Sequence, residues 1–222
     1  MNGPPAEPVH RKQEHAMNRF SLRSFLAVLA LALTMSAAAT ALAQTPDEFV
    51  KTGHAQLDAL LRQPDSAQRD AQIASTFDRM VDYDELIRRC FKQHWNELDA
   101  AKQAEVSDLL RQIVRKNYQK NLKRTLNYNI TYTGTRGQGG DVVVRTQAQS
   151  RINPRDPVVS VDYVVAGPAG GPFHVVDIVT ENSSLTTNYY RDFHRFLTTA
   201  GEGYPHLVDK LKKKIAHLNG NP

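Results

Sequence analysis

The sequence predicts an α+β fold: a helical N-terminal half packed on a curved four-stranded antiparallel sheet, with two C-terminal helices, enclosing an apolar cavity. Two observations predict it. Apolar residues recur every three or four positions up to about residue 126 and then alternate with polar residues through four short runs. Turn residues separate these runs, which favours hairpins between antiparallel neighbours. Only the apolar side of such a sheet needs a cover, and that side can enclose a cavity.

The first 43 residues have the composition of a leader. From Met17, a short basic start leads into an apolar run that ends near Leu33, and small residues follow up to Ala43. This is the order of a secretory signal peptide, with cleavage expected near Ala43. A membrane anchor is the alternative, but the run is shorter than the roughly 20 residues of a span. Residues 1–16 are a polar N-terminal extension, and we expect translation to start at Met17.

Residues 44–222 are expected to form a single domain, helical over 44–126 and with the sheet and the last helices over 127–222. Without the four basic and two acidic residues of the leader, 24 basic and 21 acidic residues remain. This net charge is too mild to indicate nucleic-acid binding. Cys90 is the one cysteine, which excludes an internal disulfide and fits a secreted protein of a bacterial periplasm. Its place in a helical apolar pattern predicts that it is buried.

Four helices are predicted in the first half, most of them beginning at a residue that can cap a helix. They run from Thr45 to about Arg62, from near Ser66 through Met80, from Asp82 through Phe91, and from Ala100 to about Leu126. Thr45 and Asp82 are each followed three residues later by glutamate, which is the capping-box pattern. The fourth helix is capped by Asp99 and is the longest.

The second half supplies four strands and two helices. The alternating positions are Tyr128, Ile130 and Tyr132; Val142, Val144 and Thr146; Val159, Val161, Tyr163 and Val165; and a fourth run, "FHVVDIVT". The turns between the strands are expected at Gly134 to Gly140, Asn153–Pro154 and Gly167 to Pro172. Helices are then expected from Thr186 to Ala200 and from about Pro205 to Leu218.

The stretch "DIVTENSSLTTNYYRDFHRFLTTAG" contains Asp177, Ser183 and His194, the residue types of a hydrolase triad. No glycine surrounds the serines, so the strained turn of an elbow nucleophile is absent from the pattern. We therefore expect no catalytic residue here, and a serine or threonine that caps the following helix. The eight histidines are scattered and no phosphate-binding loop opens a helix, so neither a metal nor a cofactor is predicted.

The long fourth helix carries a basic side made of Lys116, Lys120, Lys123 and Arg124. One interpretation is a solvated surface that serves only to keep the helix in water. The other is a weak docking face for an acidic partner or for an anionic lipid surface. The sequence leaves both interpretations open.

Three segments have a familiar order of residues. They are "HWNELDAAKQAEVSDLLRQIVRKNYQKNL", the strands "VVVRTQA" and "VVSVDYVV", and "FHVVDIVTENSSLTTNYYRDFHRFLTTAGEGYPHLVDKLKKK". The matching positions are Trp95, Leu109, Leu110, Tyr118, Asp177, Glu181, Ser184, Leu185, Tyr190, Arg191, Phe193, Gly201 and Leu211. In these features the chain resembles the MlaC-type periplasmic phospholipid-binding proteins, also called the toluene-tolerance family. It departs from them at Phe173, where tryptophan is common, and at Asn182, where glycine is common; asparagine tolerates a positive φ, so we expect the turn to be kept.

The resemblance implies a monomeric carrier, not an enzyme, that needs no cofactor and holds a phospholipid as cargo. It implies partners in an outer-membrane lipoprotein complex and in an inner-membrane ABC transporter with an MCE-domain subunit, and a role in outer-membrane lipid asymmetry. The acyl chains are expected between the sheet and the helices. Relatives associated with hopanoids make another apolar lipid an alternative cargo.

The predicted lipid-binding residues are apolar and aromatic side chains from both halves. They are Phe77, Leu86, Trp95, Leu110, Val114 and Tyr118 from the helices; Val142, Val144, Val161, Tyr163, Val176 and Ile178 from the sheet; and Tyr190, Phe193 and Leu197 from the helix that follows. Two alternatives compete with the carrier. One is a non-lipid adaptor with a filled core, and the other is a small α+β enzyme that uses Asp162 or Asp177 as a base.

Overall fold

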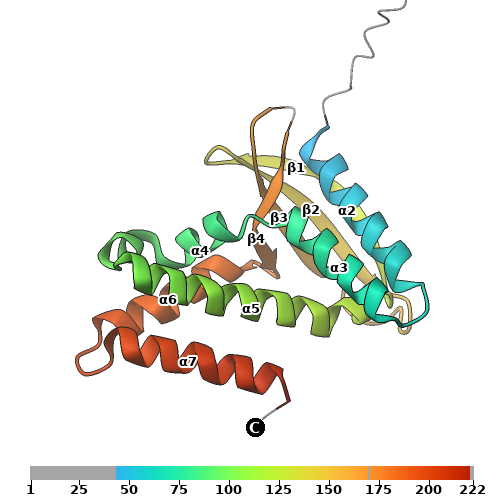
Figure 1. Cartoon of the computed structure of the whole chain (residues 1–222). Coiled ribbons are helices and arrows are strands. Elements are labelled where there is room, and N and C mark those ends of the chain that lie inside the picture. Colours follow the sequence, from blue (N-terminus) through green and yellow to red (C-terminus); the bar gives the residue numbers. More distant parts are fainter. Residues whose placement is uncertain (1–43, 170, 221–222) are drawn as a thin grey trace, which may run out of the picture. The chain divides into compact units, whose positions relative to one another are not determined.

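The structure is a computed structural model that describes residues 44–169 and 171–220 (Figure 1). The predicted leader, residues 1–43, lies outside the described residues. The helices are α2 (Pro46–Leu61), α3 (Ala67–Met80), α4 (Tyr83–Phe91), α5 (Ala100–Thr125), α6 (Leu185–Thr198) and α7 (Gly203–Leu218). Each agrees with a predicted helix to within a few residues. A 3₁₀ segment after α4, η1 (Lys92–Glu97), was not predicted.

The helix starts follow the predicted capping chemistry. The Thr45 hydroxyl accepts a hydrogen bond from the backbone N–H of Glu48, whose carboxylate accepts one from Thr45, so the capping box is complete. Asp82 accepts from the N–H of Glu85 at 2.9 Å and Asp99 caps α5 in the same way. These local bonds fix where each helix begins.

The sheet is antiparallel throughout, with neighbours in the order β1-β2-β3-β4-β5. Its strands are β1 (Tyr128–Gln138), β2 (Asp141–Ser150), β3 (Val159–Ala166), β4 (His174–Thr180) and β5 (Ser183–Ser184). The α+β class is confirmed, but the strand count is five instead of four. The additional strand is two residues long and arises because Glu181 and Asn182, at φ +49° and +63°, make a tight turn back onto β4. The positive φ expected at Asn182 is therefore present.

Strand β1 is longer than predicted and lies at the edge of the sheet. It continues through the glycine-rich segment to Gln138, so the turn is only Gly139–Gly140, with φ of +58° and +93°. A bulge shifts its register between Tyr132 and Gly134, where Gly134 has φ +127°. Glycine meets this backbone requirement without strain.

The pleat gives the sheet an inner and an outer face. We define the inner face by the residues that share a side with Val144, which pairs with Tyr163 and through it with Ile178. Its members are Val142, Val144, Thr146, Val161, Tyr163, Val165 and Ile178. Helix α2 covers one end of this face, because Val50 packs with Val144 and Val165.

A second bulge, between Val164 and Val165, changes the facing of β4. Val164 pairs with Asp177 and Val165 with Val175, so Val176 is the additional residue. It packs with the outer-face residue Val164 and with Val143. The simple alternation read from the sequence fails here because a bulge places two consecutive residues on one side.

The helical layer contains its own core, which we call the helical core. It is formed mainly by α4, α5, α6 and α7, with Phe77 of α3 also a member, and α7 lies alongside α5 (Figure 1). Among its most buried members are Ile87, Phe91, Leu110, Ile113 and Leu207, none more than 1% exposed. In residues 44–169 and 171–220, no helix has both the length and the apolar composition needed to span a membrane. Cys90 is buried in the helical core, as expected, and burial raises the pKa of its thiol.

Candidate functional site

Part of the inner face is apolar without being packed away. Val142, Val161 and Ile178 are half-buried and belong to none of the hydrophobic clusters of the described residues. On the same face, Val144 and Val165 are 0% and 1% exposed beneath α2. The inner face is thus tightly covered at one end and incompletely covered along β3 and β4.

A group of rings lies where α2 crosses the inner face. The His54 ring is 4.9 Å from the Tyr163 ring, edge to face, and 5.9 Å from that of Tyr132. His54 Nδ1 lies 2.7 Å from the Tyr132 hydroxyl, within hydrogen-bonding distance. Burial lowers the pKa of His54 to about 4 and raises that of Tyr132 to about 12. The imidazole is therefore neutral at physiological pH.

Tyr118 on α5 brings a further hydroxyl to this interior. Its ring stacks on Phe77, with 3.5 Å between ring centroids. Burial raises the pKa of both Tyr118 and Tyr163, and the neighbouring Tyr163 hydroxyl adds to the effect on Tyr118. Both side chains nevertheless keep some accessible surface. Among the described residues, no hydrogen bond engages either hydroxyl, so both can donate to a guest.

The chemistry of this region is that of a binding surface. Aliphatic and aromatic carbon covers most of it, which suits an apolar guest. The hydroxyls of Tyr118 and Tyr163 supply polar contacts within that carbon surface. The neutral His54 adds a ring without adding charge.

The predicted residues from the helices fall into two groups by burial. Phe77, Leu86, Leu110 and Phe193 are between 0% and 6% exposed, inside the helical core. Trp95, Val114, Tyr118 and Leu197 are partly buried and pack against that core. The second group therefore keeps surface that another molecule can contact.

Among the predicted sheet residues, Val176 is separated from the others, since it packs on the outer face.

The Tyr190 ring has protein partners. The Lys92 ammonium lies 4.1 Å from the centre of its ring, and the His194 ring stacks at 5.6 Å. Its hydroxyl accepts a hydrogen bond from the Gln93 side chain at 2.8 Å. Phe193, one turn away, packs on Phe91 with ring centroids 4.8 Å apart. These contacts are with protein groups of η1, α4 and α6 itself, not with the inner face.

The three residue types of a hydrolase triad do not come together. The buried carboxylate of Asp177 accepts hydrogen bonds from the Ser184 hydroxyl at 2.6 Å and from both the N–H and hydroxyl of Thr186, at 3.0 and 2.9 Å. His194 is instead 2.8 Å from His94, between Nδ1 and Nε2. Asp177 therefore anchors the turn into α6, whose N-cap is Ser184. The other proposed base, Asp162, lies on the outer face opposite Arg145.

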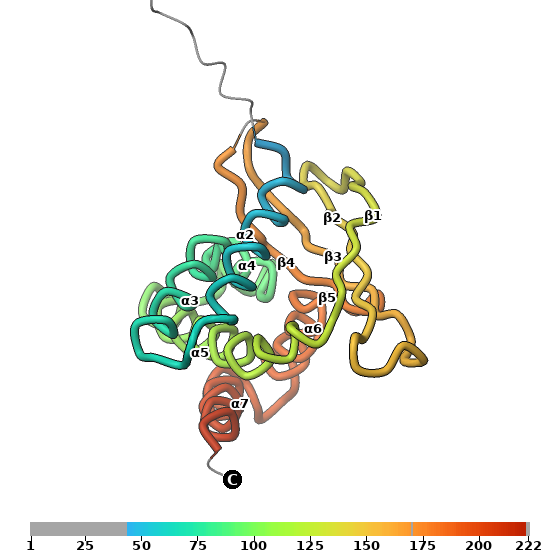
Figure 2. The backbone as a smooth tube through the Cα atoms, turned by 90° about the vertical axis from the view of Figure 1, so that its right-hand side faces the viewer, coloured from blue at the N-terminus to red at the C-terminus, as the bar shows by residue number. Residues whose placement is uncertain are grey.

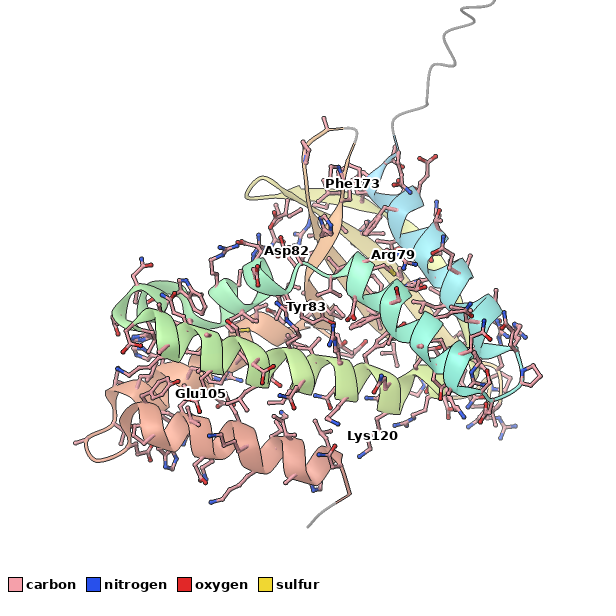
Figure 3. All side chains as sticks on the ribbon, viewed as in Figure 1. Arg79, Asp82, Tyr83, Glu105, Lys120 and Phe173 are labelled. Atoms are coloured by element: carbon pink, nitrogen blue, oxygen red, sulfur yellow. The ribbon has the colours of Figure 1, made fainter. Side chains whose placement is uncertain are left out.

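Two surface hollows lie away from the inner face. One of about 560 Å³ covers the α3–α4 junction, where Arg79, Asp82 and Tyr83 lie (Figure 3). The other, of about 270 Å³, is bordered by Arg89, Lys92 and the outer-face residue Val164. Neither is bordered by Val161, Tyr163 or Ile178, so neither is the predicted apolar cavity. Within the described ranges, no three His, Cys, Asp or Glu residues are arranged to hold a metal ion.

The basic side of α5 is only partly free. Lys123 pairs with Asp65 at 2.8 Å, whereas Lys120 and Arg124 are exposed and Lys116 is half-buried. Lys120 points away from the helix (Figure 3). Nothing in these contacts decides between a solvated surface and a docking face.

His54 is the site residue that the sequence analysis missed. It lies four residues after Val50 and three before Leu57, on the buried stripe of α2. That spacing was visible in the sequence and would have placed His54 inward. Tyr163 was found because it lies in an alternating strand, while the approach of Tyr118 to it depends on how α5 packs over the sheet.

Comparisons with known proteins agree with this architecture. A family model described as MlaC protein matches residues 53–213, more than half of the chain. A search of curated proteins finds no match. Among solved structures, a phospholipid-binding protein from Ralstonia solanacearum, determined in complex with a phospholipid, superposes with a TM-score of 0.65 at 23% identity. The alignment covers 78% of this chain and 98% of that one, which shows that the two share a fold.

Proposed function

Since this chain belongs to the MlaC family, we propose that it is a periplasmic phospholipid carrier whose cargo lies against the inner face of the sheet. One observation carries the proposal. Val142, Val161 and Ile178 present apolar surface that no core cluster of the described residues uses. Apolar surface that is left incompletely covered commonly marks a place where another apolar group binds.

The side chains around the inner face match the parts of a phospholipid. Acyl chains lie against Val161, Ile178 and Val142. The hydroxyls of Tyr118 and Tyr163 donate hydrogen bonds to the ester carbonyls near the glycerol. Buried tyrosine hydroxyls need such partners, and unengaged ones favour a guest that brings acceptors.

The energy of chain burial constrains how such a carrier works. Two acyl chains with about 30 methylenes in all, at about 0.8 kcal/mol each, gain on the order of 25 kcal/mol over exposure to water. Spontaneous release into water is therefore extremely slow. The cargo leaves only where the carrier docks and the inner face opens directly onto another apolar path.

This requirement supports a shuttle between two docking stations. In the proposed cycle, one station is an outer-membrane lipoprotein complex and the other is an inner-membrane ABC transporter with an MCE-domain subunit. Movement of phospholipid between them maintains the lipid asymmetry of the outer membrane. The chain acts by binding, and no step of the cycle requires a covalent intermediate or a cofactor.

The direct test is to identify what the protein holds. The chain is expressed with its leader in a bacterium, purified from the periplasm, denatured and extracted with organic solvent, and the extract is analysed by mass spectrometry. We expect about one phospholipid per protein. If the extract contains a hopanoid, the carrier function is supported with a different lipid as cargo. A lipid-free protein that also takes no lipid from vesicles would refute the proposal.

A matched pair of variants tests the location of the cargo. Val161→Gln places a polar amide on the inner face, and Ser160→Gln places the same group on the outer face of the same strand. We expect the first to lose most of its phospholipid and the second to keep it. Circular dichroism of both variants tests whether they are folded. Equal lipid content in the two variants would show that the cargo does not contact the inner face.

A further inference from the structure

Three large hydrophobic side chains are exposed in the described part of the chain, and they gather at one end of the sheet. Ile130, Ile152 and Val158 are 38%, 73% and 48% exposed. Ile130 pairs with Ala148, which also pairs with Val159, the residue after Val158. Ile152 lies in the β2–β3 loop, residues 151–158, which projects beyond the sheet (Figure 2).

The β2–β3 loop is held in one shape by hydrogen bonds. The N–H of Arg151 donates to the carbonyl of Asn127 at 2.7 Å, and that of Asn153 donates to the Ser150 hydroxyl at 3.1 Å. The Asn153 side chain donates to the Asp156 carboxylate at 2.6 Å, and the N–H of Asp156 donates back to the Asn153 carbonyl at 3.0 Å. These bonds on both sides of Ile152 hold a hydrophobic residue out in water.

Arginines are close in the chain to the exposed side chains, and the Arg151 guanidinium donates a hydrogen bond to the Asn129 side chain at 2.6 Å. Arg151 and Arg155 belong to the loop, and the last turn of α5 is joined to it through Asn127, whose N–H donates to the Arg124 carbonyl at 3.0 Å. Arg124, Arg151 and Arg155 form no ion pair with any acidic group in the described part of the chain. The nearby Asp156 is engaged by Asn153. Asp156 keeps its charge in this bond, so the loop itself carries two arginines and one aspartate, a net positive charge.

The exposed patch is continuous with the inner face. Ile130 and Val159 flank Ala148, and the same side of β3 continues through Val161 to Tyr163. Val159 and Val161 are both half-buried. An apolar path thus runs from the exposed end of the sheet toward the proposed cargo.

We propose that the β2–β3 loop, together with Ile130, docks this protein on an anionic lipid bilayer. Ile152 and Val158 insert among the acyl chains, and Arg151 and Arg155 bind lipid phosphates. A guanidinium is weakly hydrated and matches phosphate in two-point hydrogen bonding, which suits it to the headgroup region. A few protruding apolar side chains with arginines beside them in the loop fit the boundary between water and hydrocarbon, whereas a stable protein interface buries about 800 Å² on each partner. The inference rests on the proposed function in one respect: the docked surface lies at the end of the inner face on which the cargo is proposed to lie.

The test measures binding of the mature protein to lipid vesicles by flotation. Vesicles of phosphatidylglycerol and phosphatidylethanolamine in equal amounts are compared with vesicles of phosphatidylcholine alone. We expect binding to the anionic vesicles that weakens as salt rises. Ile152→Ser is expected to weaken it on the order of tenfold, and Arg151→Gln with Arg155→Gln to remove its preference for anionic lipid.

Matched controls separate this surface from general charge. Lys210→Gln with Lys213→Gln removes the same charge from the exposed side of α7 and is expected to leave binding unchanged, as is the conservative Ile152→Leu. Because Ile152 and both arginines are exposed, their variants are expected to fold, which thermal melting verifies. The proposal would be overturned if the wild-type protein did not bind anionic vesicles, or if the loop variants bound them as well as the wild type.

The two proposals can fail separately. Lipid extracts of the same preparations report cargo, and flotation reports docking. If the protein carries phospholipid but does not float with anionic vesicles, the docking surface is refuted and the carrier function still stands. A protein without cargo whose flotation depends on Ile152 supports the docking surface and refutes the carrier.

Discussion

The helical core and the inner face of the sheet are built from the same kinds of residues and packed differently. In the helical core, Phe91 and Ile113 are 0% exposed and lie within a continuous cluster. On the inner face, Val161 and Ile178 are half-buried and outside every cluster of the described residues. Apolar spacing in a sequence therefore indicates which side of an element faces inward, not how well that side is packed.

The two regions therefore have different expected tasks. A filled core supplies stability, since each buried side chain contributes transfer and packing energy. An incompletely covered face gains less from the fold and leaves surface for a guest. If this division is right, substitutions in the helical core should change stability, and substitutions on the inner face should change lipid retention.

The largest expected effect is on the stability of the helical core. Phe91→Ala removes a ring packed on Phe193 and Trp95. We expect it to lower the free energy of unfolding by about 3 to 5 kcal/mol, measured by urea denaturation followed with circular dichroism. Val161→Ala on the inner face should lower it by less than about 1 kcal/mol. Equal losses would show that the inner face is packed as tightly as the core.

Asp177 joins the two regions, because it lies within β4 and its carboxylate holds the start of α6. Asp177→Ala leaves the N–H and hydroxyl of Thr186 without their acceptor, so we expect a loss on the order of 3 kcal/mol. Asp162→Asn on the outer face is the control and should cost little. Urea denaturation of both variants measures the difference. If Asp177→Ala is as stable as the control, the carboxylate does not anchor the turn.

His54 makes the stability of the inner-face region depend on pH. Burial lowers its pKa from 6.5 to about 4, so the unfolded chain takes up a proton across this interval that the folded chain does not. The free energy of unfolding should therefore fall as the pH falls from 6.5 to about 4, by on the order of 3 kcal/mol in total. Urea denaturation at a series of pH values measures this slope.

Two variants isolate the contribution of His54 to that slope. His54→Phe removes the titrating group and should flatten the curve between the two pH values. His217→Gln, on the exposed side of α7, removes another histidine and should leave the curve as it is. A His54→Phe protein with the wild-type slope would assign the pH dependence to other groups.

Tyr163→Phe is expected to have the smallest effect on stability. It should nevertheless change phospholipid retention. The hydroxyl has no hydrogen-bond partner among the described residues, so the fold should lose almost nothing. Phospholipid retention should fall roughly fivefold, as expected for one hydrogen bond of about 1 kcal/mol. Tyr190→Phe is the matched control, because the hydroxyl that it removes is engaged by Gln93, away from the inner face. Transfer of fluorescent phospholipid to vesicles measures retention in both.

Most of the fold could be predicted from local signals. Thr45, Asp82 and Asp99 fix the starts of three helices through bonds to residues three positions on, which a sequence displays directly. The failures lie where a backbone irregularity or a distant partner decides. The bulge that turns Val176 outward and the two-residue strand β5 depend on how β4 meets its neighbours.

The candidate site was predictable only in outline. Alternation placed Val142, Val161, Tyr163 and Ile178 on one side, and the structure keeps them together. Periodicity could not distinguish these binding candidates from the core residue Phe193. An aromatic residue in a helical pattern has the same spacing whether it contacts protein or a bound molecule. Tyr118 and Tyr163 lie 45 positions apart in the chain, and no local pattern indicates that their hydroxyls approach each other.

The bulge in β1 has a consequence for how copies of this molecule behave toward one another. As the outermost strand, β1 offers backbone groups to which a neighbouring chain could add a strand and so begin a growing aggregate. The interruption between Tyr132 and Gly134 breaks the regular ladder that such an added strand would have to match. The irregularity that shapes the edge therefore also makes it a poor template for self-assembly, which suits the proposed role of a dispersed lipid carrier.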